Sequence, residues 1–404
     1  MDQGIHPRPS PFQRHPRLTI ALVLLVLLAA SEGGLRLGYA WWTGFDAGEA
    51  ALLRADGVED VRLFRRELER LTNELGQYHP YRWYALPPSF TGRYHSTDRH
   101  GFRNGPLRPG TARVGFFGGS TTYSVRTTAE GSIPGIVDRK VDQTQAQAVN
   151  YGVGGYDSTA ELTTFIEVTR HPDHGIRWAV FLDGVNEVSR YAEKWQAQAT
   201  QPFYGVMGYR WPGALPAVRT EVGVAARPRL ALMRALTWLS ERTSRLGDLR
   251  DLATSDEDYR RAGRAIANIY LANLQDIRAL AGAKEIVPIF LLQPTVFEVV
   301  RPSGREQAIR DRAAARVVDI GRLYAAAYGA IRGDARFAAL GVHDLGDALE
   351  GRSGEIFFDE CHVTSAGNAL IAERIVALLS GLGVFDSGST VPPAVSGAAP
   401  AACP

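Results

Sequence analysis

The chain has 404 residues, and its 45 Lys and Arg against 43 Asp and Glu give a formal net charge of +2. A balance this close to neutral gives no electrostatic case for nucleic acid as a partner. The 42 glycines follow no triplet period, which excludes collagen, and Cys361 and Cys403 are too few for a disulfide framework. With 45% hydrophobic and 22% charged residues, the composition is that of a folded protein with one large domain or two ordinary ones.

The N-terminus combines a basic segment with an apolar run. Residues 1–17 contain three arginines and one acid, and residues 18–30 carry no charge. The run alone is shorter than the ~20 residues that cross a bilayer, and it would fit the core of a cleaved signal peptide. A helix that continued to residue 42 would be long enough, and no convincing small-residue cleavage site follows the run. We therefore predict a transmembrane signal anchor over residues 18–42.

The distribution of basic residues predicts the orientation of this anchor. Arg8, Arg14 and Arg17 precede the apolar run, and Arg36 alone lies within its far end. Basic flanks stay on the cytoplasmic side of a membrane. We therefore expect a cytoplasmic segment over residues 1–17 and a catalytic domain outside the cytoplasm, in the periplasm. No other run in the sequence approaches membrane length, so the prediction is a single-pass, membrane-anchored protein.

Residues 43–110 are predicted to form an N-terminal extension. As far as residue 75 the spacing of leucines favours helix. Residues 78–110 are rich in Tyr, Pro, Arg and Gly and lack a helical period, which indicates short strands and turns.

From residue 111 onward, short apolar runs alternate with helical patterns. Near-continuous apolar strands between helices are typical of a parallel sheet covered on both faces. We therefore predict an α/β fold, a three-layer α/β/α sandwich, over residues 111–380. Its expected strands are 113–117, 148–151, 178–182 and 285–292, the last of them blemished by Pro288. Its expected helices begin after a Ser132 cap and at a Ser158–Glu161 capping box, and then cover 255–281, 306–331 and 365–380.

Two segments depart from this alternation. Residues 188–254 form a predicted insertion that is rich in Trp, Tyr and Phe. It could cover the edge of the sheet, or it could serve as a lid or substrate wall. The end of the chain, 381–404, is rich in Pro, Ala, Gly and Ser from Ser387 onward and is predicted to be a disordered tail.

The first predicted strand ends in Gly118-Gly119-Ser120-Thr121-Thr122. A serine at a glycine turn just past a buried strand lies at the carboxyl edge of the sheet, where α/β folds bind ligands. Ser120 could also simply cap the following segment. The motif is not the Gly-x-Ser-x-Gly elbow, because position 122 is Thr, and it is not a phosphate-binding loop.

Three further motifs follow later strands. The second strand ends in Gly152-Val-Gly-Gly155, and the third precedes Asn186. Each of these could be no more than a turn. Near the C-terminus, Asp359 stands three residues before His362, close enough to orient an imidazole. Cys361 between them is more typical of a packing residue than of a nucleophile.

Together the four motifs bring Ser, Gly, Asn and Asp-x-x-His to one rim of the predicted sheet. This combination suits acyl transfer, with Ser120 as nucleophile and His362 as general base oriented by Asp359. The backbone amides of Ser120 and Gly155, with the side chain of Asn186, would form the oxyanion hole.

This order and spacing resemble the SGNH (GDSL-type) hydrolase superfamily, over about residues 111–380. The resemblance implies a flavodoxin-like core, a Ser120–His362–Asp359 triad and oxyanion donors at Ser120, Gly155 and Asn186. Two positions depart from the usual pattern. Gly119 stands where the first block usually has Asp, and Glu187 follows Asn186 where Asp is usual.

Three further segments look like those of membrane-anchored bacterial members of this superfamily. They are His79-Pro80-Tyr81, Gly101-Phe102-Arg103 and Leu292-Gln293-Pro294. Arg103 and Gln293 are therefore additional candidates to approach the substrate.

The resemblance implies a serine esterase outside the cytoplasm, acting on carboxylic esters such as O-acetyl groups of cell-envelope saccharides. An O-acyltransferase that passes the acyl group to a saccharide would use the same triad, and a catalytically inactive envelope protein would keep the fold. No cofactor and no metal is expected, because neither His-x-Glu nor Cys-x-x-Cys spacing occurs. The sequence indicates no protein partner beyond the membrane and an ester substrate.

Overall fold

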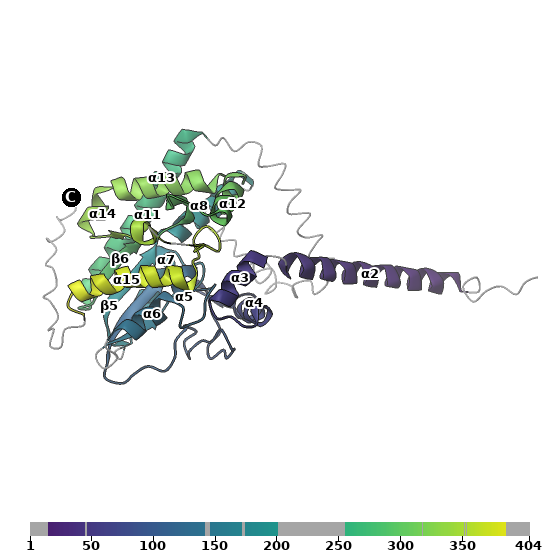
Figure 1. Ribbon diagram of the computed structural model, residues 1–404, viewed down its shortest axis with the longest axis horizontal. Helices are drawn as coiled ribbons and strands as arrows, with labels where there is room; N and C mark the ends of the chain where they lie inside the picture. The colour runs from purple at the N-terminus through teal and green to yellow at the C-terminus, as the bar shows by residue number, and fades with distance from the viewer. Residues whose placement is uncertain are drawn as a thin grey trace, which may run out of the picture. The chain divides into compact units, whose positions relative to one another are not determined.

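The computed structural model describes residues 15–44, 47–141, 146–171, 174–200, 255–316, 318–350, 352 and 354–384. Its centre is a parallel sheet of five strands in the order β4-β3-β5-β6-β7. Helices lie on both faces of this sheet (Figure 1). The predicted three-layer α/β/α sandwich is therefore confirmed. The strands are β3 (Ala112–Gly118), β4 (Ala146–Asn150), β5 (Ile176–Asp183), β6 (Val287–Leu292) and β7 (His343–Asp344).

Alternate residues of the strands pack on opposite faces of the sheet, as the pleat requires. On one face, Val114 and Phe116 of β3 join a buried, mainly aliphatic cluster with α6 (Ile133–Lys140) and α15 (Ser365–Gly381). Figure 1 shows these two helices side by side. As predicted, Ser132 caps α6 by accepting a hydrogen bond from the Gly135 amide.

Aromatic rings fill the other face. The rings of Tyr151, Phe117, Phe181 and Phe290 follow one another across the strands, with centroids 5.0, 4.9 and 5.7 Å apart. This face is covered by α7 (Ser158–Val168), α11 (Asp256–Ala283) and α13 (Ile320–Gly333). The helix α7 is capped by Asp157, which accepts from the Ala160 amide, and not by the Ser158 capping box that the sequence suggested.

The helix predicted over 306–331 is in fact two helices, α12 (Gly304–Ala314) and α13. The Asp319 carboxylate accepts from the amide of Arg322 and starts a new helix there. The Tyr259 hydroxyl, on the neighbouring helix α11, accepts from the Asp319 amide and so holds the chain at the point where the two helices are separated. The long apolar periodicity concealed this interruption because both helices bury the same kind of face.

Pro288 is tolerated in β6 because the strand on its outer side is very short. β7 pairs only with Leu291 and Leu292, so Pro288 has a neighbouring strand on one side only, at Ala179 of β5. The strand β7 was not predicted from the sequence, because two residues are too few to show the alternation of apolar and polar side chains that marks a strand. The remaining short elements of the sandwich are α5 (Ser120–Tyr123), η5 (Val296–Glu298), α14 (Ala335–Ala339) and η6 (Gly346–Leu349).

The N-terminal extension is helical first and then irregular, as predicted. It contains α3 (Ala47–Ala55), α4 (Val61–Glu69), the π-helical turn η1 (Arg70–Glu74) and an antiparallel pair, β1 (Gln77–His79) with β2 (Trp83–Ala85). Its apolar side chains form a second cluster with Phe358, the residue before Asp359. The extension therefore packs directly behind the loop that carries Asp359.

One helix among the described residues, α2 (Pro16–Gly44), is long and apolar enough to cross a membrane. Residues 17–34 have a mean hydropathy of 1.7, and a signal sequence would have the same character. The beginning of the predicted insertion is helical, because α8 (Val185–Thr200) runs through it. The rest of the insertion, 201–254, and the tail from residue 385 lie outside the described residues.

Candidate active site

A crowded glycine turn places Ser120 at the carboxyl end of β3. A side chain at Gly118 would meet the Thr122 hydroxyl at 2.0 Å, and one at Gly119 would meet the Asn186 Nδ2 at 1.9 Å. Only glycine therefore fits at either position while Asn186 and Thr122 keep their places. A larger residue at position 119 would therefore have to displace the Asn186 amide.

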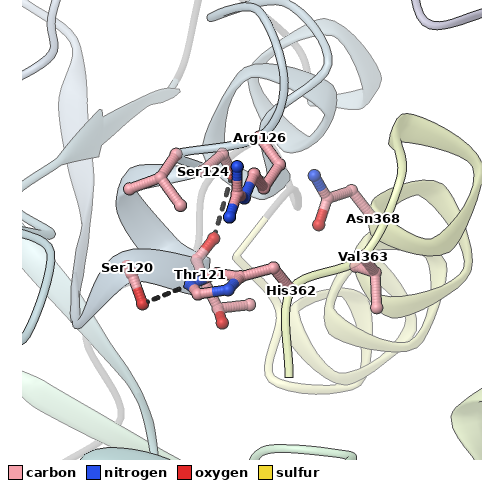
Figure 2. Close-up of a pocket in the computed structure, with 8 residues that line it drawn as sticks. Ser120, Thr121, Ser124, Arg126, His362, Val363 and Asn368 are labelled. Carbon is pink, nitrogen blue, oxygen red and sulfur yellow. Dashed lines mark hydrogen bonds between the residues drawn. The ribbon is translucent and has the colours of Figure 1, made fainter. Parts of the chain in front are cut away.

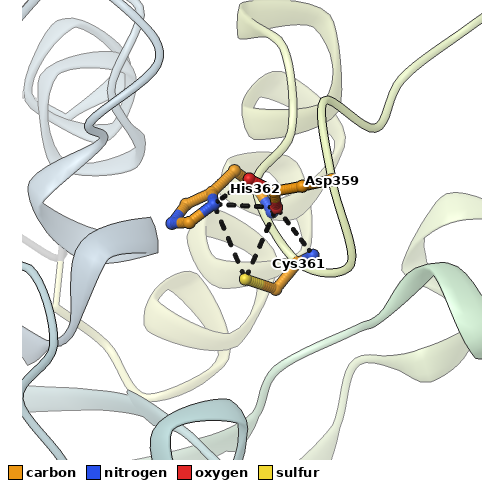
Figure 3. Close-up of side chains that lie close together, drawn as sticks. All are labelled: Asp359, Cys361 and His362. Atoms are coloured by element: carbon orange, nitrogen blue, oxygen red, sulfur yellow. Dashed lines mark hydrogen bonds and ion pairs between the residues drawn. The ribbon is translucent and has the colours of Figure 1, made fainter. Parts of the chain in front are cut away.

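The structure brings Ser120, His362 and Asp359 into one line of hydrogen bonds. The Ser120 Oγ lies 2.6 Å from His362 Nε2, although the two residues are 242 positions apart (Figure 2). On the other side of the ring, His362 Nδ1 lies 2.7 Å from Asp359 Oδ2 (Figure 3). The His362 amide also donates to Asp359 Oδ1 at 2.9 Å, which fixes the carboxylate relative to the ring.

The charge on Asp359 is stabilised by its neighbours. Burial would raise the pKa of its carboxyl, but the charge and hydrogen bonds of His362, with the charge of Arg126, hold that pKa well below its ordinary value. The Arg126 guanidinium lies 3.7 Å from Asp359 Oδ2 and also pairs with Glu49 of α3. Sequence reasoning missed Arg126 and Glu49, because no local spacing links either of them to Asp359.

Two further motifs border Ser120. Asn186 stands in the first turn of α8, and its Nδ2 donates to the Tyr156 carbonyl at 2.6 Å, which leaves its second N–H available. A side chain at Gly154 would lie 3.8 Å from the Ser120 Cβ, so this glycine loop passes close to the serine. Gly155 follows with φ +81°, and its carbonyl accepts from Arg190. An oxyanion hole of the Ser120 and Gly155 amides with Asn186 stays a prediction.

Glu187, which follows Asn186 where the SGNH pattern usually has Asp, holds two loops together. Its carboxylate accepts from the Ser158 amide at 2.6 Å and from the Gly184 amide at 3.1 Å. It therefore ties the loop before Asn186 to the start of α7. Burial, followed by the charge of Asp157, raises the pKa of Glu187.

Arg103 and Gln293 do not line the Ser120 pocket, contrary to the expectation that they approach substrate. The Arg103 guanidinium is buried and donates to four backbone carbonyls, those of Tyr94, Tyr123, Ser124 and Thr127. Gln293 is also buried, and its Nε2 donates to the Thr121 hydroxyl at 2.7 Å and to the Cys361 carbonyl at 3.3 Å. Arg103 therefore holds the loop that follows Ser120, and Gln293 links that region to the loop that carries His362.

A small pocket opens beside Ser120 and His362. Figure 2 shows Arg126 and Asn368 on its walls, neither of which sequence reasoning had identified. Asn368 is fixed by a 2.8 Å hydrogen bond from its Nδ2 to the Gly131 carbonyl. The pocket has a volume of about 10 Å³ and is partly open to solvent. This size suits a short acyl group better than a long one.

Asp359, Cys361 and His362 also form a compact set of potential metal ligands, with donor atoms within 4.8 Å of one another (Figure 3). Their chemistry fits an imidazole oriented by a carboxylate better. His362 Nδ1 and Asp359 already satisfy each other, and burial followed by the charge of Asp359 raises the pKa of the Cys361 thiol. A protonated thiol is a poor metal ligand.

No family model and no curated protein matches the sequence. Among solved structures, the chain is similar to a carbohydrate acetylesterase from Sinorhizobium meliloti at 11% identity and a TM-score of 0.36, covering 67% of this chain and 100% of the other. A member of the lipolytic G-D-S-L protein family from Veillonella parvula matches at 12% identity and a TM-score of 0.35, covering 67% and 99%. An acetylxylan esterase from Geobacillus stearothermophilus matches at 14% and 0.29, covering 70% and 98%. At such values these likenesses assign no role to any residue.

Proposed function

We propose that this chain is an SGNH-type serine esterase that cleaves carboxylic esters. The observation that carries the proposal is the line of hydrogen bonds from Ser120 Oγ through His362 to Asp359, with separations of 2.6 and 2.7 Å. A hydroxyl, an imidazole and an ionised carboxylate in this order are the groups that nucleophilic acyl transfer requires.

The reaction begins when Ser120 Oγ attacks the ester carbonyl carbon and passes its proton to His362 Nε2. Asp359 keeps His362 in the correct tautomer and stabilises the resulting imidazolium. The free N–H of Asn186 and the amides of Ser120 and Gly155 receive the negative charge on the carbonyl oxygen. The alcohol then leaves with the proton from His362, and water activated by the same imidazole releases the acid from the acyl-enzyme.

The small pocket beside Ser120 favours an acetyl group as the acyl part. We infer that the alcohol is a saccharide of the cell envelope, because the basic N-terminal segment and the apolar helix α2 support a catalytic domain held outside the cytoplasm.

The full-length chain in detergent tests this proposal with aryl acetate, butyrate and octanoate esters. We expect the acetate to be hydrolysed fastest, and Ser120→Ala to abolish hydrolysis, whereas Ser380→Ala on the exposed end of α15 changes nothing. Undiminished activity of Ser120→Ala would contradict the proposal. Addition of an oligosaccharide, with analysis of the products, distinguishes hydrolysis from transfer, since a transferase would form acetylated sugar in place of acetate.

A further inference from the structure

A second cavity lies along the edge strand β4, on the aromatic face of the sheet. It has a volume of about 630 Å³, within the range of small-molecule sites. Its walls come from the extension between His79 and Leu107, and from Arg113, Val149 and Tyr151 of the sheet region. The end of α7, with Arg170, His171 and His174, completes them. None of its lining residues lines the pocket beside Ser120. The cavity exists because the extension, not a helix, covers the aromatic face at β4.

The walls of this cavity carry an excess of positive charge. Four arginines line it, against the two acids Asp98 and Glu167. Glu167 is already engaged by Arg82 at 2.8 Å and by His79 at 3.3 Å. Asp98 accepts from the backbone amides of His100 and Phe102. The excess of two positive charges is therefore available to an anionic ligand, and Arg99 and Arg170 are exposed where they can bind one.

The cavity walls also carry imidazoles, which can bind ligand hydroxyls, and apolar side chains, which can contact the face of a ligand ring. Burial, followed by nearby positive charge, lowers the pKa of His79 and of His174. His174 Nδ1 accepts from the Ile176 amide at 2.9 Å, so the neutral ring can offer its Nε2–H to a ligand. The ring of His79 is engaged on both sides, by the Arg82 amide and by Glu167. Leu107 and Val168, both partly accessible, supply apolar surface on opposite walls.

We propose that this cavity binds an anionic saccharide unit, a sugar ring that bears a carboxylate or a phosphate. Arg99 and Arg170 hold the oxyanion, the Nε2–H of His174 donates to a hydroxyl, and Leu107 and Val168 contact the ring. The site is one of binding and not of catalysis. Arg113 at its wall lies near the start of β3, whereas Ser120 follows the end of that strand, about 20 Å away along an extended chain.

Titration calorimetry on the full-length Ser120→Ala chain in detergent tests the proposal without turnover. The probes are glucuronic acid, glucose 6-phosphate and glucose, which share a ring and differ in charge. We expect at least one of the acids to bind at least tenfold more tightly than glucose, with an affinity that falls as salt is raised. The acid that binds more tightly identifies the oxyanion. Equal affinity for glucose and both acids, or no binding of any probe up to about 10 mM, would overturn the proposal.

Two substitutions locate the site. Arg99→Gln and Arg170→Gln should each weaken binding of the preferred acid about tenfold, because each removes a charge-assisted hydrogen bond. Arg139→Gln, on the exposed surface of α6, is the matched control and should leave binding unchanged. Unchanged affinity in both cavity variants would overturn the assignment. Esterase activity measured in parallel, in chains that keep Ser120, should be unaffected by either variant, so failure of one proposal is distinguishable from failure of the other.

Discussion

Single residues at the carboxyl edge of the sheet determine whether the proposed chemistry can proceed. Ser120 is a weak nucleophile by itself and depends on the 2.6 Å contact with His362. His362 depends in turn on Asp359, whose negative charge is stabilised by Arg126 at 3.7 Å. Each link can be removed by a substitution that preserves the size of the side chain.

Ser120→Ala should reduce ester cleavage to the background rate. The change removes one hydroxyl at the rim of a pocket, so the free energy of unfolding should change by less than about 1 kcal/mol. Initial rates with an aryl acetate and a denaturant titration measure the two effects. A variant that unfolds much more easily would mean that the hydroxyl has a structural role instead.

Asp359→Asn should lower kcat by up to ~10⁴-fold, because the imidazole loses its correct tautomer and its stabilising charge. KM should change little, since Asp359 does not line the pocket. Steady-state kinetics separate the two parameters. A large rise in KM with normal kcat would argue that Asp359 contacts substrate.

The depressed pKa of Asp359 also predicts how stability depends on pH. A carboxyl with a lowered folded-state pKa contributes stability that is fully present above its ordinary value of about 3.9, and this contribution is lost as pH falls through the folded-state pKa. Denaturant titrations below about pH 4 should therefore show a smaller loss of stability for Asp359→Asn than for the unaltered chain. Parallel curves for the two proteins would contradict the depressed pKa.

Asn186→Ala should retain measurable activity, reduced ~100- to 1,000-fold, because the two backbone donors remain. The loss should appear mainly in kcat, since the third donor acts on the oxyanion and less on the bound ester. Complete inactivity would show that Asn186 also supports the turn at Gly119, against which its amide lies.

At the scale of elements, buried polar side chains hold the loops that deliver these residues. Arg103 binds the carbonyls that follow α5, including that of Ser124, which adopts a left-handed φ of +63°. Glu187 and Gln293 tie the loops after β5 and β6 to their neighbours. The candidate site therefore rests on contacts between elements far apart in the chain.

Arg103→Lys keeps the charge but cannot reach four carbonyls at once. We expect a loss of about 3 kcal/mol in the free energy of unfolding, because buried acceptors remain unsatisfied. At a temperature where the variant is folded, kcat should also fall while KM is little changed, since the loop after Ser120 loses its support. Arg139→Lys on exposed α6 controls for the substitution itself and should match the unaltered chain in both measurements.

At the scale of the whole molecule, the apolar helix α2 predicts that the enzyme works on one side of a membrane. A reporter that is active only outside the cytoplasm, fused to the C-terminus, should be active in cells that express the full chain. Replacement of Arg8, Arg14 and Arg17 by Gln should weaken this orientation, because basic residues hold the N-terminus inside. Reporter activity in the cytoplasm of cells with the unaltered chain would contradict the topology.

The sequence by itself determined the class of fold. Buried parallel strands appear in it as apolar runs, and amphipathic helices appear as a periodic spacing of apolar residues. It also indicated which loops meet, since the carboxyl ends of parallel strands share one edge. Features that depend on residues far apart in the chain were decided only by the tertiary structure. The break at Asp319 is set by Tyr259, the requirement for glycine at position 119 by Asn186, and the burial of Arg103 by carbonyls from separate loops. Arg126, Glu49 and the basic cavity beside β4 left no local pattern, because each is made by side chains that only the folded chain brings together.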